Sequence, residues 1–217
     1  MGEVGHLLRA QGRFATNAAG VPWRHLCVIG ATGCVLYGFV MGGHSLRPLQ
    51  AFYSCFKLPL LLAASTAICL PSFFVLNTLL GLRDDFSAAC RGVFAAQATI
   101  GVALVSLTPV LLVVYLGTPA YRLCQVLNGV LLLVATAAGQ VTLARHYRAL
   151  IRRNPLHRVP YFGWLALYVF VAIQMAWVLR PFVGNPRLPV GFLRPDPWNN
   201  AYLEIGKIVG RVLRRML

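Results

Sequence analysis

Acidic residues are scarce in this chain, since its 217 residues include 5 Asp+Glu against 20 Lys+Arg. Charged residues of both signs make up 12% of the sequence, whereas a soluble domain usually carries about 25%. So few charges cannot cover a water-facing surface of this size, and we expect lipid to surround most of the chain. No Asp or Glu occurs within the long apolar runs. That absence weighs against a proton-coupled transporter or pump, because such proteins need an ionisable group at depth.

The familiar catalytic and metal-binding patterns are also missing. The six cysteines have neither C-x-x-C spacing nor a histidine at metal-ligand spacing, and no G-x-S-x-G, P-loop or Rossmann glycine pattern occurs. The only adjacent carboxylates are Asp84 and Asp85, in the stretch GLRDDF. A metal site needs further carboxylates or histidines beside them. We therefore expect no catalytic site, metal or cofactor, and we expect the two aspartates to pair with neighbouring arginines.

Long apolar runs dominate what is present, and 58% of the residues are hydrophobic. A hydrocarbon core of about 30 Å takes roughly 20 residues of helix. We predict an all-α integral membrane protein, with a bundle of about five transmembrane helices within 26–179. The first run is longer than a signal-peptide core and lacks an A-x-A-like site, so we expect it to be retained. The predicted spans lie near 26–43, 58–82, 92–116, 123–144 and 159–179.

Basic residues predict the orientation of this bundle. The stretch RHYRALIRRNPLHR (145–158) carries five arginines, so by the positive-inside rule it and the N-terminal tail, 1–25, are expected in the cytoplasm. The loops predicted on the opposite side hold only Arg47, Lys57 and Arg122. We predict a multi-pass protein of the bacterial inner (cytoplasmic) membrane. The net charge of +15 comes from arginines at membrane edges, and we expect no nucleic-acid partner.

The last part of the chain, 180–217, is predicted to be a Pro-rich segment followed by a basic amphipathic helix. Five spans place it outside despite its basic residues, unless 46–57 or 180–193 enters the bilayer part way. Apolar residues recur every three or four positions from Trp198 to Met216. We expect this helix to lie in the interface against anionic headgroups, with packing on a partner protein as the alternative. The cations off its apolar stripe are Lys207, Arg211, Arg214 and Arg215.

Two further patterns concern helix packing. Small residues at every fourth position of the first span form a flat strip, which allows close approach of another helix of this chain, of a second copy or of a partner. Neutral amides within the spans are expected to hydrogen-bond between helices. Pro71 and Pro109 fall inside spans and are candidate hinges. The strip consists of Gly30, Cys34, Gly38 and Gly42, and the amides are Asn77, Gln97, Asn128, Gln140 and Gln174.

The end of the fifth span reads QMAWVLRPFVGNP. Trp177 and Arg180 are three residues apart, so both occupy one helix face at the water boundary, and Pro181 prevents the helix from continuing. We expect Arg180 to anchor the helix among headgroups. The alternatives are an arginine that binds a lipid phosphate and one that pairs with Asp84 or Asp85.

The stretches FKLPLLLAASTAICLPSFFVLNTLLG and AIQMAWVLRPFVGNPRLPVGFLRPDPWNNAYLEI resemble a group of uncharacterised bacterial polytopic membrane proteins. Those proteins share a K-x-P apolar span and a late span that ends in W-x-L-R-P-F. The architecture is also similar to that of Yip1-like five-span proteins, which act in membrane organisation and trafficking. The second likeness is an analogy of span number and loop style, and neither one implies an active site.

Together these patterns predict a non-enzymatic subunit or scaffold embedded in the membrane, which packs with partner proteins, anionic lipid or both. Two alternatives come from other classes of protein. One is a channel or facilitator for a small solute, gated at Pro71 or Pro109. The other, ranked third, is a lipid-acting enzyme that uses Asp84 and Asp85.

Overall fold

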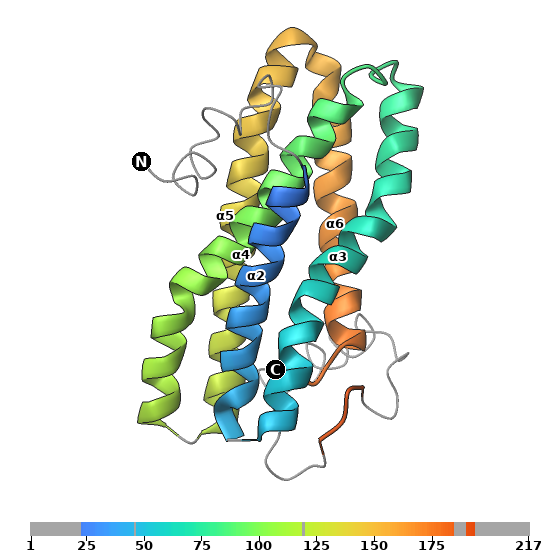
Figure 1. Ribbon diagram of the computed structural model, residues 1–217. Coiled ribbons are helices and arrows are strands. Elements are labelled where there is room, and N and C mark those ends of the chain that lie inside the picture. Colours follow the sequence, from blue (N-terminus) through green and yellow to red (C-terminus); the bar gives the residue numbers. More distant parts are fainter. Residues whose placement is uncertain (1–22, 46, 119, 185–189, 194–217) are drawn as a thin grey trace, which may run out of the picture.

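The computed structural model describes residues 23–45, 47–118, 120–184 and 190–193, and within these residues the chain is helical and contains no strand. Its long helices run up and down in a bundle (Figure 1). Five helices of the described residues are long and apolar enough to cross a membrane, as predicted for an all-α multi-pass protein. The helices are α2 (Trp23–Gly42), α3 (Pro48–Leu79), α4 (Phe86–Gly117), α5 (Tyr121–Arg153) and α6 (Arg158–Val178), with short 3-10 turns η2 (Gly43–Ser45) and η3 (Pro155–His157).

Two helices extend well beyond the predicted spans. Helix α3 begins at Pro48 rather than at 58, and α5 continues to Arg153 rather than ending at 144. An uncharged run marks the thickness of the hydrocarbon, whereas a helix can continue into the headgroup layer with arginines on its surface. The placement of Lys57 in a loop was therefore wrong. Lys57 lies in the third turn of α3 and is fully buried.

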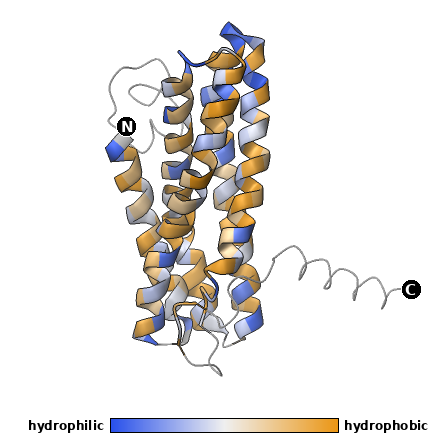
Figure 2. Cartoon of the chain, turned by 90° about the vertical axis from the view of Figure 1, so that its right-hand side faces the viewer, coloured by the Kyte–Doolittle hydropathy of each residue, from blue (hydrophilic) through white to orange (hydrophobic). Residues whose placement is uncertain are grey.

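The bundle has two ends of different composition, and its sides are mostly hydrophobic (Figure 2). One end, here the arginine end, contains residues 80–85 and η3, and the basic last turns of α5 lie there. The other, the Arg180 end, contains η2 and residues 179–184. Buried clusters lie toward both ends: Tyr37 and Leu104 belong to the cluster nearer the Arg180 end, and Tyr147 and Trp164 to the other.

The small-residue strip of α2 packs against helices of the same chain. A Cβ added at Gly30 would lie 3.2 Å from the Cα of Ala98 in α4, and one added at Gly38 would lie 2.9 Å from the Cα of Cys55 in α3. Cys34 is fully buried between them. Gly42 makes a similarly close approach to α3. The strip is therefore covered inside the bundle, and a partner protein would have to use another surface.

The candidate hinge prolines do not break their helices. Helix α3 continues through Pro71 and α4 through Pro109. Both ribbons change direction within the bundle (Figure 1). Because a proline inside a helix removes one backbone hydrogen bond, bending of this kind is expected. Whether either helix moves during function stays a prediction.

Candidate functional site

Three polar side chains of α3 bind the backbone just beyond the end of α6. Gln50, Ser54 and Lys57 follow one another at helical spacings, so they share one face of α3, and all three are buried. Ser54 Oγ donates to the carbonyl of Phe182 at 2.5 Å, and Lys57 Nζ donates to that of Pro181 at 2.6 Å. Gln50 Nε2 donates to both carbonyls, at 3.1 and 3.2 Å. We call these three side chains the Lys57 clamp.

The clamp satisfies the backbone carbonyl groups of Pro181 and Phe182, which follow the end of α6 and have no helical partners. Helix α6 ends at Val178, and Pro181 has no N–H and a ring that prevents a further turn. An unpaired buried carbonyl costs about 1–3 kcal/mol, so side chains of neighbouring helices must supply the donors. Tyr121 of α5 also contributes, since its hydroxyl donates to the carbonyl of Val183 at 3.3 Å. Residues 181–183 are thus fixed to α3 and α5.

A cavity of about 500 Å³ adjoins this fixed segment and is lined by residues of α2, α3, α5 and α6. Its polar lining consists of Tyr121, Gln125 and Asn128 from α5, together with Trp177 and Arg180. We call it the Arg180 cavity. The rest of its lining is apolar or backbone and comes from Met41, Leu61, Gly129, Leu132, Ile173, Ala176, Pro181, Phe182 and Val183.

Arg180 and Trp177 form one unit in the wall of the Arg180 cavity. The guanidinium carbon of Arg180 lies 3.4 Å from the centroid of the Trp177 ring, so the cation stacks on the indole face. The indole Nε1 is buried, and no acceptor for its hydrogen is present among the described residues. Guanidinium and indole groups donate hydrogen bonds and do not accept them. These two side chains therefore bring a positive charge and hydrogen-bond donors to the wall, and neither brings an acceptor.

A hydrogen-bonded network holds the opposite wall in place. Tyr37 of α2 donates to Asn128 Oδ1 at 3.0 Å, and Asn128 Nδ2 donates to Tyr115 Oη at 2.8 Å and to the carbonyl of Cys124 at 2.7 Å. Tyr115 in turn donates to the carbonyl of Met41 at 3.0 Å. Three helices meet in this network, so the shape of the cavity is set without a ligand.

The other predicted amides play several roles. Gln97 Oε1 accepts a hydrogen bond from the hydroxyl of Tyr168 at 3.1 Å, which joins α4 to α6. Asn77 is buried but donates to a carbonyl of its own helix, so its bond does not join two helices. Gln140 Oε1 is buried with no donor among the described residues, and Gln174 is half-buried in α6.

The paired aspartates lie at the arginine end, away from the Arg180 cavity. Asp85 Oδ2 is 3.1 Å from His157 Nε2, and His157 is fully buried whereas the Asp85 side chain is 38% exposed. Arginines were predicted as the partners of the two aspartates, and the contact between Asp85 and His157 was not predicted. Arg180 follows the opposite end of α6 from His157, about 30 Å away along the helix. The alternative prediction that Arg180 pairs with Asp84 or Asp85 was therefore wrong. Among the described residues no group of three or more His, Cys, Asp or Glu could hold a metal ion.

The cations predicted for the C-terminal helix, Lys207, Arg211, Arg214 and Arg215, lie outside the described residues, as do most of the N-terminal tail and the apolar stripe that begins at Trp198. The interfacial helix and its lipid contacts stay predictions. Of the predicted lipid-contacting residues, the structure brings together Trp177 and Arg180.

No protein-family model, curated protein or solved structure matches this chain. The two stretches that carry the sequence resemblance nevertheless meet in space. Lys57, of the K-x-P stretch, binds the carbonyl of Pro181, of the W-x-L-R-P-F stretch. The two motifs are therefore parts of one structural unit, which also forms a wall of the Arg180 cavity.

Proposed function

We propose that this protein is a non-enzymatic subunit or scaffold embedded in the membrane. It holds the phosphate headgroup of an anionic lipid in the Arg180 cavity. The main support for the proposal is the stacking of Arg180 on Trp177 in the wall of this cavity. A guanidinium stacked on an indole, beside a buried N–H that has no acceptor among the described residues, fits a ligand that is negatively charged and accepts hydrogen bonds. Lipid phosphate has both properties.

The composition and place of the cavity favour a lipid over a small soluble anion. Leu61, Leu132 and Ile173 line it together with the polar groups, so it suits a molecule with a charged head and an apolar body. Its volume of about 500 Å³ lies within the usual range of ligand pockets, roughly 300–1,000 Å³. Arg180 follows directly on a helix that is apolar and long enough to span a membrane, at the depth where headgroups begin.

The charge of the two ends supports an orientation for the bundle. The arginine end carries Arg152, Arg153 and Arg158. Within the part of the chain that the structure describes, the cations at the Arg180 end are Arg47, Lys57, Arg122 and Arg180, and the basic tail lies outside that part. Burial lowers the pKa of His44, so this histidine adds no charge to the Arg180 end at neutral pH. By the positive-inside rule we infer that the arginine end and the N-terminus face the cytoplasm. The Arg180 cavity then opens in the outer leaflet of the bacterial inner membrane.

Lipid retention by variants of the full chain tests this proposal. Purified protein is exposed to equal amounts of phosphatidylglycerol and phosphatidylcholine, and the lipid that stays bound is measured by native mass spectrometry. We expect wild type to retain one phosphatidylglycerol, and Arg180→Gln to bind it roughly 10- to 100-fold more weakly, because hydrogen bonds to charged groups contribute about 1.5–3 kcal/mol.

Arg122→Gln is the matched control, because Arg122 is an exposed arginine at the same end of the bundle. This variant should retain phosphatidylglycerol as wild type does. Equal loss in both variants would mean that general surface charge, and not the cavity, attracts the lipid. Inorganic phosphate added at millimolar concentration distinguishes a free anion, since displacement of the lipid by phosphate alone would overturn the lipid as the ligand.

A further inference from the structure

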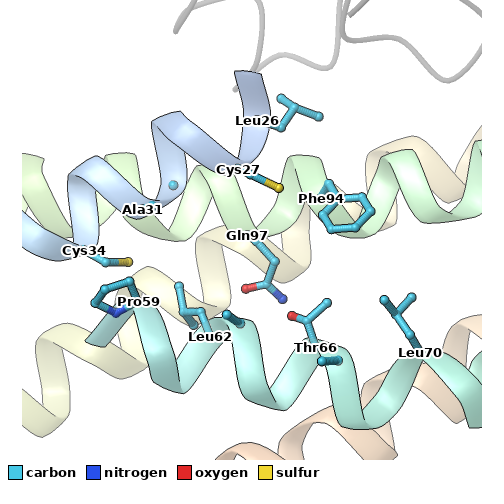
Figure 3. A pocket seen from close by; sticks show the side chains of 13 residues that line it. Leu26, Cys27, Ala31, Cys34, Pro59, Leu62, Thr66, Leu70, Phe94 and Gln97 are labelled. Carbon is cyan, nitrogen blue, oxygen red and sulfur yellow. The ribbon is translucent and has the colours of Figure 1, made fainter. Parts of the chain in front are cut away.

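A second cavity, of about 300 Å³, lies between α2, α3 and α4. Figure 3 shows its lining, which is mostly apolar and includes Leu26, Leu62, Leu70 and Phe94. Helix α2 packs closely on α4 near Gly30 and on α3 near Gly42. The cavity is lined by residues 26–34 of α2, toward the start of that helix from its close contacts with α3. We call it the Gln97 cavity, after the one amide in its lining.

Two polar groups face each other in the Gln97 cavity. Thr66 is 5% exposed, and its Oγ1 has no hydrogen-bond partner among the described residues. Gln97 Oε1 accepts the hydroxyl of Tyr168, and this bond turns the amide nitrogen toward the cavity. In Figure 3 the amide nitrogen of Gln97 and the hydroxyl of Thr66 point toward one another. Both can donate to an atom between them.

These features define the chemistry of a ligand that would suit the Gln97 cavity. A buried hydroxyl without a partner is costly in an apolar setting, so an acceptor that fills the gap is favoured. The surrounding wall is hydrocarbon, so the acceptor has to belong to a neutral and largely apolar molecule. A volume of about 300 Å³, at the low end of the range for ligand pockets, suits a single ring or a short chain segment.

The depth of the cavity in the membrane further restricts the class of ligand that it can bind. Thr66 lies near the middle of α3 (Pro48–Leu79), and Gln97 lies within about 7 Å of the middle of α4 (Phe86–Gly117), at 1.5 Å per residue. Both are therefore inside a hydrocarbon layer of about 30 Å. The ester carbonyls of glycerolipids lie at the edge of that layer. A carbonyl that reaches this depth belongs to a molecule dissolved in the hydrocarbon itself.

We propose that the Gln97 cavity binds a lipophilic quinone, one ring carbonyl of which accepts hydrogen bonds from Gln97 Nε2 and Thr66 Oγ1. The ring lies among the apolar side chains of α2, α3 and α4, and the alkyl tail continues into the lipid. The site is separate from the Arg180 cavity and takes a neutral ligand, so it stands whether or not that cavity binds a phosphate.

The test measures binding of a decyl-substituted benzoquinone to nanodiscs that contain the full chain, with empty nanodiscs as the background for partition into lipid. Wild type should bind it, and Thr66→Val should bind it about 5-fold more weakly, as expected for loss of one hydrogen bond. Thr66→Ser keeps the hydroxyl and should bind as wild type does. Thr142→Val is the matched control, because Thr142 is also buried but its hydroxyl bonds the carbonyl of Ala138.

Three results would overturn the proposal. Equal binding of the quinone by Thr66→Val and Thr142→Val would show that the hydroxyl of Thr66 does not bind the ligand. Equal binding of decylbenzene, which lacks a carbonyl, would show that hydrocarbon alone fills the cavity. Displacement of the quinone by a diacylglycerol at similar concentration would identify a glyceride ester as the occupant. Arg180→Gln should leave quinone binding unchanged, which keeps this test distinct from that of the Arg180 cavity.

Discussion

The two cavities of this bundle are built from the same kind of helix but offer opposite chemistry. The Arg180 cavity lies at one end, where its lining includes Arg180, a cation stacked on Trp177, and Trp177 itself, whose indole N–H is buried. The Gln97 cavity lies at the depth of the hydrocarbon, where the polar groups are one amide and one hydroxyl. Full charge is costly in the hydrocarbon and tolerated near headgroups. Depth thus determines which ligand each cavity suits.

The cavities also differ in what holds their walls. The Arg180 cavity depends on hydrogen bonds, since the Lys57 clamp and Tyr121 fix residues 181–183. The Gln97 cavity depends on close packing of backbones, because α2 crosses α4 where Gly30 and Gly33 meet Gly101. Changes that disturb one kind of contact should therefore affect one cavity more than the other.

The largest effect is expected from Gly101→Ala. A Cβ at Gly101 would lie 2.7 Å from the Cα of Gly30, so α2 must move away from α4, and overpacking of this kind costs about 1–3 kcal/mol. We expect a lower melting temperature in detergent and loss of quinone binding. Phosphatidylglycerol retention should fall less, because α2 contributes to the Arg180 cavity through Met41 and the bond from Tyr37 to Asn128, whereas the Lys57 clamp does not involve α2. Gly129→Ala is the control, since Gly129 has open space around it. Equal melting temperatures for the two variants would contradict the account of α2–α4 packing.

A smaller effect is expected from Lys57→Met, which fills similar space but removes one donor to the carbonyl of Pro181. The unfolding free energy should fall by about 1–3 kcal/mol, and phosphatidylglycerol retention should weaken because the segment after Arg180 is less well held. Thermal unfolding and lipid retention measure the two effects. Quinone binding should not change, and Arg122→Gln, an exposed cation at the same end, should shift stability by less than about 0.5 kcal/mol.

The smallest effect is expected from salt. Raising ionic strength from about 0.1 to 1 M shortens the Debye length from about 10 to 3 Å, and a partly buried charge pair is screened only in part, so phosphatidylglycerol binding should weaken roughly 2- to 5-fold. Quinone binding should be constant, because its ligand carries no charge. Parallel titrations of both ligands would reveal a charged ligand in the Gln97 cavity if both affinities fell together.

Much of the fold could be predicted from the sequence, because apolar runs of the right length report directly on membrane spans. The pairing of Trp177 and Arg180 was also accessible, since a spacing of three places both on one helix face. The ends of the helices were harder to predict from the sequence. The arginines after 144 interrupt the apolar run without interrupting α5, which continues to Arg153.

The Lys57 clamp could not be predicted, although its three residues share one helix face. Their partners are backbone carbonyls of Pro181 and Phe182, and carbonyls leave no mark in a sequence. Contacts between distant loops were equally hidden, as in the case of Asp85 and His157, which are 72 positions apart. The Gln97 cavity depends on the paths of three helices and the Arg180 cavity on those of four, which no local pattern specifies.

The most direct test of the central claim is whether an anionic lipid lies next to Trp177. Phosphatidylglycerol with a nitroxide near its headgroup quenches tryptophan at close range, and the difference between wild type and Trp177→Phe isolates the emission of Trp177. We expect labelled phosphatidylglycerol to quench this emission more strongly than phosphatidylcholine with the same label, and we expect Arg180→Gln to remove the preference. Equal quenching by the two lipids in wild type would contradict an anionic headgroup in the Arg180 cavity.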